Sequence, residues 1–448
     1  MWKTFGRLLV VLVSVTMVAA ACSSDDGDAD SGGGGGSGSD PAPADIDYEA
    51  IGLWDDGPCD EAAAPLHIGL MTTFESPVIS LEDQALALEA AAEAFNARGG
   101  ANGSCIQVTT CDDKANPEAA VGCVRTIADA GVVVTVNDQG LAAQGDVAEA
   151  MVAAGIPRMA GNVAPQDWND PNSYPIDASG TGVTFLLPQA LIDAGKTEIA
   201  AIRVGQAEAS ALIGILEDIY EGDATFTEDI PVPAGTTDFS QFILSAQESG
   251  ATGATLAVGE QEAVQIVKAG EQLGSDLTLG SSLGTFSHNN IAELGDYAEQ
   301  MVFAWSFAPP TADLPVYDAM RADLAASGEE SLEAVNLKAS PVRSWIGLYA
   351  LLKMIRDADM TEFTSDGIRT MLDAATDVPM LDMFGGDNWT PNESHPGLFS
   401  RAGIDRWATY NWDPDAEGEF DGNFVEASEL SFDEVLCGSP FGAPADSC

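Results

Sequence analysis

The chain has 448 residues, which at about 150 residues per domain corresponds to two or three domains. Hydrophobic residues make up 46% and charged residues 20%, a composition that excludes a disordered or fibrous chain. The 71 acidic and 17 basic residues give a formal net charge of −54. A surface this acidic repels phosphate backbones, so nucleic-acid binding is excluded. With only 3 histidines, the chain has few options for histidine-centred catalysis.

Residues 1–21 have the pattern of a secretory signal peptide, with Lys3 and Arg7 before an apolar centre and small residues before Cys22. Cys22 resembles the acylated cysteine of bacterial lipoproteins, although Ala19 stands where leucine is usual. The alternative is ordinary cleavage after Ala21, which would leave a free thiol. No other stretch has about 18 uncharged apolar residues, so no transmembrane helix is expected in the mature chain.

Residues 22–45 are rich in Ser, Gly, Asp and Pro and include Gly32–Gly36. This composition predicts a flexible tether, anchored by lipid to the outer face of the bacterial cell membrane. A net charge this large destabilises a compact body unless salt screens it. A saline habitat is therefore a further hypothesis.

Six cysteines remain when Cys22 is set aside, and an even number in an exported protein predicts disulfides. Their spacing is not C-x-x-C and no histidine accompanies them, so no metal site is expected. Fifteen pairings are possible for six cysteines. Among them we prefer Cys111–Cys123, Cys59–Cys105 and Cys437–Cys448.

From Leu66 the chain alternates short apolar runs with amphipathic runs. An apolar face at spacings of three and four predicts a helix from Leu81 to Phe95, with Ser80 as N-cap, and Asn116-Pro117 opens a second helix. The first series comprises strands 66–71, 106–110, 132–136 and 156–160 and a third helix, 146–154.

A second series begins after Gly180-Thr181-Gly182. It comprises helices 183–194, 209–220, 238–248 and 263–273, and strands 199–204, 226–231, 255–258, 277–280 and 301–305. Helices 316–326, 344–357 and 365–375 follow, and then a tail with hairpin character near 407–412. Strand–helix alternation predicts an α/β fold with two doubly wound parallel-sheet lobes. In such sheets ligands bind at the carboxyl ends of the strands, so the loops there are candidate sites.

Four segments carry a family resemblance: Ile68–Gly100, which ends FNARGG, then CDDKANPEAAVGCV (Cys111–Val124), GTTDFSQFI (Gly235–Ile243) and NIAELGDYAEQM (Asn290–Met301). In order and spacing, residues 65–436 resemble the solute-binding lipoproteins of ABC importers of the branched-chain amino-acid and amide type. The resemblance implies a type I periplasmic-binding-protein fold with three crossovers and hinge closure on a small solute.

On this basis we expect lobe 1 to span 46–177 plus 309–385 and lobe 2 to span 181–306 plus 386–436. A disulfide-pinned tail, 437–448, would follow. The crossovers would fall near 174–182, 305–310 and 378–386.

The resemblance also implies a clamp for α-amino acids, and this sequence departs from it at four points. Ala142 and Ala143 stand where serines grip the ligand carboxylate, and Ala164 replaces a threonine. Ser281 stands where an acidic residue binds the ligand ammonium, and Gln206-Ala207-Glu208-Ala209 replaces a Tyr-Gly segment. Free leucine-like amino acids are therefore not the expected ligands.

An amide, polyol or cationic solute is expected instead. The candidate ligand-binding residues lie in the strand-end loops: Thr73, Phe74, Glu75, Asn137, Asp138, Gln139, Gly161, Asn162, Val163, Gln206, Glu208, Gly259, Glu260, Thr285 and Phe286. Phe74, Val163 and Phe286 would supply apolar walls. The alternative for any one of them is a solvated turn.

Three other motifs suggest different chemistry. Gly280–Gly284 fits G-x-S-x-G, the nucleophile elbow of serine hydrolases, but no helix is evident directly after it. Asp413–Asp421 begins like a calcium loop, although Phe424 stands where the bidentate Glu belongs, so an acidic hairpin is the alternative. The tail tryptophans Trp389, Trp407 and Trp412 would either line the cleft or pack in the core.

The sequence therefore predicts a monomeric, extracytoplasmic receptor that hands a small solute to an ABC permease and ATPase. No cofactor, metal or catalytic set is expected. A sensory lipoprotein that signals to a partner and an exported hydrolase using Ser282 remain as alternatives.

Overall fold

A computed structural model describes residues 46–448 apart from 75, 77–79, 141, 162–166, 206, 329–337, 398–399, 418–421 and 448. All of them belong to one compact unit, Pro43–Cys448. The predicted signal peptide, the tether and Cys22 lie outside the described residues.

Lobe 1 is built on a parallel sheet in the order β2-β1-β3-β4-β5. Its strands are β1 (Leu66–Thr72), β2 (Ile106–Asp112), β3 (Val134–Val136), β4 (Arg158–Met159) and β5 (Ser173–Tyr174). Leu70 and Met71 are both fully buried but belong to different hydrophobic clusters, one on each face of the sheet. Burial on both faces explains why β1 is mostly apolar.

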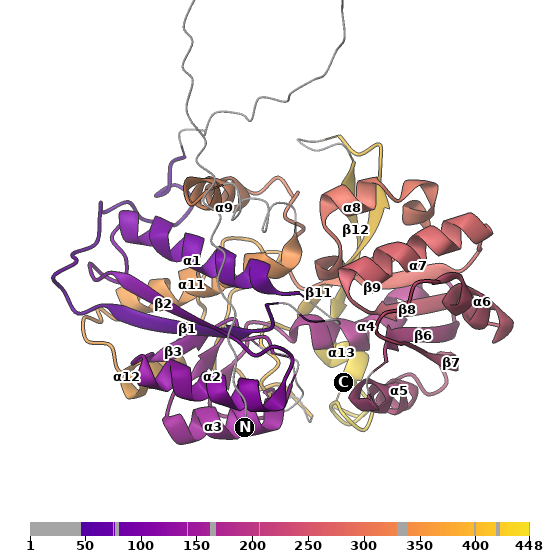
Figure 1. The fold of residues 1–448 in the computed structure, drawn as a ribbon, viewed down its shortest axis with the longest axis horizontal. Coiled ribbons are helices and arrows are strands. Elements are labelled where there is room, and N and C mark those ends of the chain that lie inside the picture. Colours follow the sequence, from indigo (N-terminus) through magenta and orange to yellow (C-terminus); the bar gives the residue numbers. More distant parts are fainter. Residues whose placement is uncertain are drawn as a thin grey trace, which may run out of the picture. The chain divides into compact units, whose positions relative to one another are not determined.

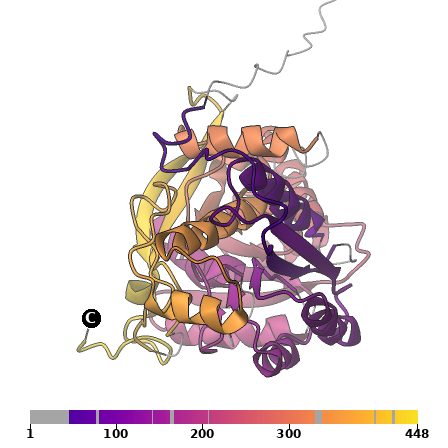
Figure 2. The ribbon, with the colours of Figure 1, turned by 90° about the vertical axis from the view of Figure 1, so that its left-hand side faces the viewer.

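Helices cover both faces of this sheet (Figure 1). The helices of lobe 1 are α1 (Glu82–Ala97), α2 (Pro117–Asp129), α3 (Gln144–Ala154), α9 (Pro315–Ala326), α11 (Ala339–Asp357) and α12 (Ser365–Ala374). α1 packs against α9 and α11, and α2 packs against α3. The last three helices, drawn in orange, lie one above another in Figure 2. Chain segments far apart in sequence thus complete one lobe.

Lobe 2 is built on a sheet in the order β12-β11-β10-β9-β8-β6-β7. β6 (Glu198–Val204), β7 (Thr225–Val232), β8 (Gly253–Ala257), β9 (Thr278–Ser282) and β10 (Val302–Trp305) are parallel, and their order repeats that of lobe 1. The hairpin β11 (Arg406–Asp413) and β12 (Asn423–Ser431) adds antiparallel strands at β10. The prediction of two lobes of similar build is confirmed.

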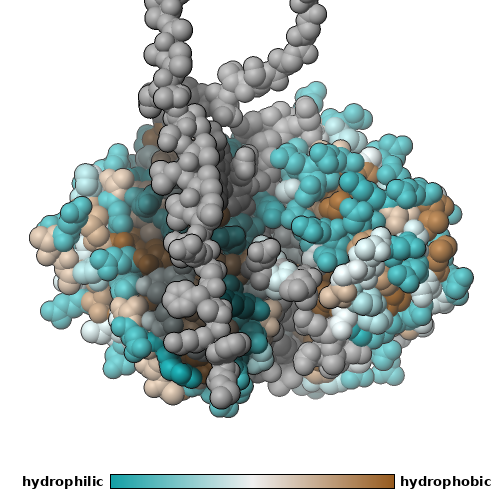
Figure 3. All heavy atoms as spheres, viewed as in Figure 1, coloured by the Kyte–Doolittle hydropathy of each residue, from teal (hydrophilic) through white to brown (hydrophobic). Residues whose placement is uncertain are grey.

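The helical elements of lobe 2 are α4 (Ser179–Asp193), α5 (Ala207–Ile219), α6 (Ser240–Glu248), α7 (Glu260–Leu273), η1 (Leu283–Thr285), α8 (His288–Ala292), η2 (Gly295–Gln300) and α13 (Phe432–Leu436). α4 packs on β8, β9 and β10, while α6 and α7 pack against each other. On the part of this lobe coloured in Figure 3, hydrophilic residues predominate, as the large net charge leads us to expect.

Three crossovers join the lobes. The first runs side by side with the segment that leads from the third into β11, at the parallel bridge between Asp177 and Ile404. Asp177, in the first crossover, accepts a hydrogen bond from Ser306 in the second. Arg343 Nη2 on α11 lies 2.7 Å from the same carboxylate oxygen, Asp177 Oδ2. Because all these side chains are buried, the crossovers pack together where the hinge is predicted.

Two predictions about helix starts had different outcomes. α2 opens at Asn116-Pro117 as predicted, and the Asn116 side chain caps it by accepting hydrogen bonds from the backbone amides of Glu118 and Ala119. The prediction of Ser80 as N-cap of α1 is wrong. Leu81 occupies that position, and the Ser80 hydroxyl donates instead to the Phe74 carbonyl at 2.7 Å.

Gly180-Thr181-Gly182 also lies inside a helix, α4, and not in a loop before one. A Cβ on Gly182 would meet Trp407 Cζ2 at 3.1 Å and the Ala178 Cβ at 2.4 Å. The glycine therefore allows close packing against Trp407 and does not mark a linker.

The Cys59–Cys105 and Cys111–Cys123 disulfides are both present. Cys59–Cys105 ties the segment before β1 to the start of β2, and Cys111–Cys123 joins β2 to α2. Cys437 is also disulfide-bonded, but its predicted partner Cys448 lies outside the described residues. Among the described helices, none is both long and apolar enough to cross a bilayer.

Candidate functional site

Each sheet reverses its strand order at one point, which is where open α/β sheets bind ligands. In lobe 1 this point lies between β1 and β3, and in lobe 2 between β6 and β8. The loops after β1 and β3 are held together, because Gln139 N donates to Met71 O and Thr72 Oγ1 donates to Gln139 O, both at 2.9 Å.

The loop after β1 begins with two predicted site residues. Thr73 is buried and its hydroxyl donates to Asp113 Oδ1 at 2.5 Å. Phe74 is half-buried and its amide donates to Asp112 Oδ1 at 3.1 Å. Carboxylates at the carboxyl end of β2 therefore fix the position of this loop.

The loop after β3 contains Asn137 and Gln139. Asn137 adopts a φ of 61°, and its side-chain amide donates to Ser344 Oγ on α11 at 2.7 Å. Gln139 is partly exposed, and its Oε1 accepts from Gln84 Nε2 on α1 at 2.6 Å. These side chains connect the loop to the helices that cover the sheet.

Asp138 lies in the same loop but points into the protein. Its oxygens accept hydrogen bonds from Met71 N at 2.8 Å and Thr135 Oγ1 at 2.5 Å, and Arg158 Nε lies 3.4 Å away. Burial raises the pKa of Asp138, while Arg158 acts in the opposite direction. Arg158 also pairs with the buried Asp167. The carboxylate thus holds β1 and β3 together, and contact with a ligand remains a prediction.

Gly161 lies where the chain after β4 passes the loop after β3. A Cβ there would stand 2.4 Å from both the N and the O of Asp138. Only glycine permits this approach, so Gly161 fixes the spacing of two predicted ligand loops.

In lobe 2, Gly259 is the N-cap of α7 and Glu260 is its first residue. Glu260 is partly exposed, and its Oε1 accepts from Asn290 Nδ2 at 2.5 Å. A carboxylate in the first turn of a helix is favoured by the helix dipole.

Two further predicted residues lie near β9. Thr285 ends η1 and is partly exposed. Phe286 is 1% exposed and packs edge-on against Phe303, so it belongs to the core of lobe 2. Glu75, Asn162, Val163 and Gln206 lie outside the described residues, and the side chain of Glu208, in α5, is likewise not described.

Lys338 joins the two lobes and was missed by sequence reasoning. Its Nζ lies 3.3 Å from Asp83 Oδ2 on α1 and 2.8 Å from Glu260 Oε2 on α7. The scarcity of basic residues could have pointed to it. With 17 basic residues and 71 acidic ones, the chain has few cations that can pair with carboxylates.

An exported hydrolase using Ser282 would need a histidine partner, and the next histidine along the chain is His288. Ser282 Oγ accepts from Gly284 N and caps η1, so a 3-10 turn follows this strand directly. His288 Nε2 lies 3.1 Å from Gly422 O, and its ring packs on Trp412. Both side chains thus have structural roles.

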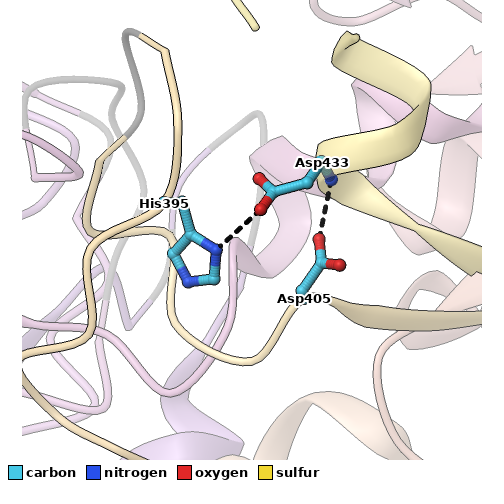
Figure 4. Close-up of side chains that lie close together, drawn as sticks. All are labelled: His395, Asp405 and Asp433. Atoms are coloured by element: carbon cyan, nitrogen blue, oxygen red, sulfur yellow. Dashed lines mark hydrogen bonds and ion pairs between the residues drawn. The ribbon is translucent and has the colours of Figure 1, made fainter. Parts of the chain in front are cut away.

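A cluster of His395, Asp405 and Asp433 was also missed (Figure 4). Their potential ligand atoms lie within 4.8 Å of one another, close enough to hold a metal ion. Internal hydrogen bonds already account for this arrangement. His395 Nδ1 lies 3.1 Å from Asp433 Oδ2, and Asp405 accepts from the Asp433 amide and the Ser431 hydroxyl. We therefore assign the cluster to the anchoring of α13.

The described residues of the remaining motifs have structural roles. Asp413 ends β11 and accepts from Asp415 N at 2.9 Å, whereas residues 418–421 lie outside the described residues. Trp389, Trp407 and Trp412 are buried, which confirms the core-packing alternative.

Several solved structures are similar to this chain. The solute-binding protein of an ABC transporter from R. palustris, in complex with 4-hydroxybenzoate, aligns with a TM-score of 0.66 and 15% identity, covering 82% of this chain and 97% of that one. A fatty acid ABC transporter substrate-binding protein from Thermomonospora curvata aligns with a TM-score of 0.69 and 15% identity, covering 86% and 96%. The leucine-, isoleucine-, valine-, threonine- and alanine-binding protein from Brucella ovis, in a closed conformation, aligns with a TM-score of 0.63 and 16% identity, covering 83% and 97%.

At these identities the likeness shows the fold, which is that of type I periplasmic binding proteins. No curated protein matches the chain. The family model described as "Periplasmic binding protein" matches residues 65–398. With this match over most of its length, the chain belongs to the periplasmic binding protein family.

Proposed function

We propose that this chain is the extracytoplasmic solute-binding receptor of an ABC importer. It captures a small solute between its lobes and delivers it to a permease and its ATPase. The observation that carries the proposal is the family match over residues 65–398. The similar structures from R. palustris and Thermomonospora curvata, both from ABC transporters, support it.

We infer further that the solute is polar, amide-bearing or cationic and is not a free α-amino acid. Ala142 and Ala143 bring no hydroxyl to the loop after β3, and Ser281 brings no charge to β9. The proposed contacts are Thr73, Phe74, Asn137, Gln139, Gly259, Glu260 and Thr285, with Glu75, Asn162, Val163, Gln206 and Glu208 as further candidates.

We also propose that the mature protein is a monomer attached to the outer face of the cell membrane by a lipid on Cys22. The support is the signal-like segment that precedes this cysteine and the acidic, glycine-rich segment that follows it. Mass spectrometry of the N-terminal peptide tests the anchor, because an unmodified Cys22 would contradict it.

A thermal-shift panel on residues 46–448 tests the importer proposal. The compounds are branched-chain and cationic amino acids, short amides, urea, polyols, small aromatic acids and fatty acids. A compound present at 100 times its dissociation constant stabilises the fold by about 2.7 kcal/mol. This corresponds to a rise of a few degrees in melting temperature.

The outcomes separate the parts of the proposal. A shift with an amide, polyol or cation supports both the receptor role and the inferred solute class. A shift with leucine, isoleucine or valine contradicts the inferred class but leaves the receptor role intact. If no compound shifts the melting temperature, the inferred solute class is unsupported, and the hydrolase and sensory alternatives are the next to be tested.

A further inference from the structure

Lys338 reaches carboxylates on both lobes. It stands directly before α11 of lobe 1. Its Nζ lies 3.3 Å from Asp83, which is in the first turn of α1 in the same lobe. Glu260, 2.8 Å from the same Nζ, belongs to lobe 2. Separation of the lobes would therefore break the Lys338–Glu260 pair and leave the Lys338–Asp83 pair intact.

The surroundings hold this ion pair in place. The backbone of Lys338 forms an isolated antiparallel bridge with Ser287 of lobe 2. Asn290 donates to the other oxygen of Glu260 and so orients its carboxylate. The side chains of Lys338 and Glu260 are 26% and 25% exposed, so solvent screens the pair less than it screens a surface ion pair.

The ammonium group remains charged at neutral pH. Burial lowers the pKa of Lys338, but the nearby carboxylates of Asp83 and Glu260 outweigh this effect and raise the pKa above its usual value. The cation that lies between the two carboxylates is therefore present over the neutral range.

The first turns of α11 connect this pair to the hinge and to a predicted ligand loop. Arg343 contacts Asp177 in the hinge. Ser344 Oγ accepts from Asn137 Nδ2 at 2.7 Å and donates to Gln84 O at 2.9 Å. One short segment of helix therefore contacts the hinge, the loop after β3 and the start of α1.

We propose that Lys338 is a positioning residue whose ion pair with Glu260 ties the two lobes together and populates the closed arrangement even without a solute. A pre-populated closed state raises the apparent affinity in proportion to its population. This inference concerns the ligand-free protein, so it stands or falls independently of the importer proposal.

Small-angle X-ray scattering of ligand-free protein tests the tie. Residues 46–448 serve, because they lie within one compact unit that contains both sheets. The radius of gyration of a compact chain of this size is about 21 Å. We expect Lys338→Met to increase it on the order of 1 Å by opening the lobes, and Lys338→Arg to leave it close to that of the wild type.

Lys353→Met is the matched control. Lys353 is on the same helix, and the substitution removes the same charge, but its partner Asp357 is one turn away in the same lobe. Its radius of gyration should equal that of the wild type. Equal radii for Lys338→Met and Lys353→Met, with unchanged circular dichroism, would overturn the proposal.

A pair of double substitutions identifies the partner. Glu260→Gln should open the lobes as Lys338→Met does, and combining the two should open them no further. Asp83→Asn should have little effect, because its pair with Lys338 lies within lobe 1. The charge swap Lys338→Glu with Glu260→Lys is made in the Asp83→Asn background, because a glutamate at position 338 would otherwise repel Asp83. It should restore compactness. A swap that stays open in this background, or an Asp83→Asn variant as open as Glu260→Gln, would contradict a specific tie between Lys338 and Glu260.

Discussion

Gly161 shows how a single residue sets the spacing of the proposed site. The loops after β3 and β4 approach so closely here that any side chain would collide with the backbone of Asp138. Backbone atoms cannot rotate away as a flexible side chain can. The substitution of this glycine therefore affects both stability and the positions of Asn137 and Gln139.

We predict that Gly161→Ala destabilises the fold by about 1–3 kcal/mol through overpacking. Its melting temperature should fall by several degrees. Gly145→Ala in α3 is the control, because a Cβ there meets nothing within 4 Å. It should be neutral or stabilising by about 0.5–1 kcal/mol. Equal melting temperatures for the two variants would show that the loops move apart at no cost.

His395 gives the anchor of α13 a dependence on pH. Burial lowers the pKa of His395, but the hydrogen bond and charge of Asp433, aided by Asp405 and Glu393, raise it above its usual value of 6.5. Because the folded-state pKa is the higher one, the charged imidazole stabilises the fold fully below about pH 6.5. The contribution is lost as the pH rises through the folded-state pKa.

We predict that Asp433→Asn lowers the free energy of unfolding more at pH 5.5 than at pH 8.5. The difference should be on the order of 1 kcal/mol, as expected for a hydrogen bond to a charged group. Urea unfolding at the two pH values measures it. In a His395→Gln background the same substitution should have a pH-independent effect. An equal loss at both pH values in the wild-type background would rule out this role for His395.

At the scale of the elements, the long helices and strands could be predicted from the sequence. β1 and β6 are largely buried and mostly apolar, and α2 carries its own capping residue, so local chemistry decides them. β5 and β4 have two residues each, too few to show a period. The Ser80 hydroxyl donates to the Phe74 carbonyl and does not cap α1. That contact depends on how the loop after β1 folds.

The contacts of the proposed site were less predictable for the same reason. The doubly wound order places the loops after β1 and β3 side by side, so Thr73 and Asn137 could be named from the pattern. The ion pair of Lys338 with Glu260 joins segments far apart in sequence across two lobes. Nothing local to either residue encodes that contact.

The two disulfides should differ in their contribution to stability. Cys59–Cys105 spans 46 residues of sequence and Cys111–Cys123 spans 12. In the chain-entropy model the larger loop restricts the unfolded chain more, by about 1 kcal/mol. We therefore predict that Cys59→Ala with Cys105→Ala lowers the free energy of unfolding more than Cys111→Ala with Cys123→Ala. Denaturant titration measures both, and the reverse order would show that the buried packing of Cys123 outweighs loop entropy.

At the scale of the whole molecule, charge dominates. A formal net charge of −54 means that the compact state brings many carboxylates closer together than the unfolded chain does. The ion pairs described above offset only part of this repulsion, since 17 basic residues face 71 acidic ones. Screening by salt should therefore favour the folded state.

We predict that the melting temperature rises between about 0.1 M and 1 M NaCl, as the Debye length falls from about 10 Å to about 3 Å. KCl at the same ionic strength should have the same effect if screening is the cause. Sucrose, which adds no ions, is the control for stabilisation by exclusion of solute from the protein surface. A melting temperature that does not change with salt would remove the physical basis for the saline-habitat hypothesis.

The placement of the β11–β12 hairpin has a consequence for biogenesis. A chain that emerges amino-terminus first presents β10 long before Arg406, where its antiparallel partner begins. During that interval the outer edge of β10 has unpaired backbone groups beside Phe303 and Trp305, a template for wrong pairing. Meanwhile α9, α11 and α12 emerge and complete the helical layer of lobe 1. The elements of lobe 1 are thus all synthesised before the hairpin, and a chain terminated before the hairpin would carry an exposed, aggregation-prone sheet edge.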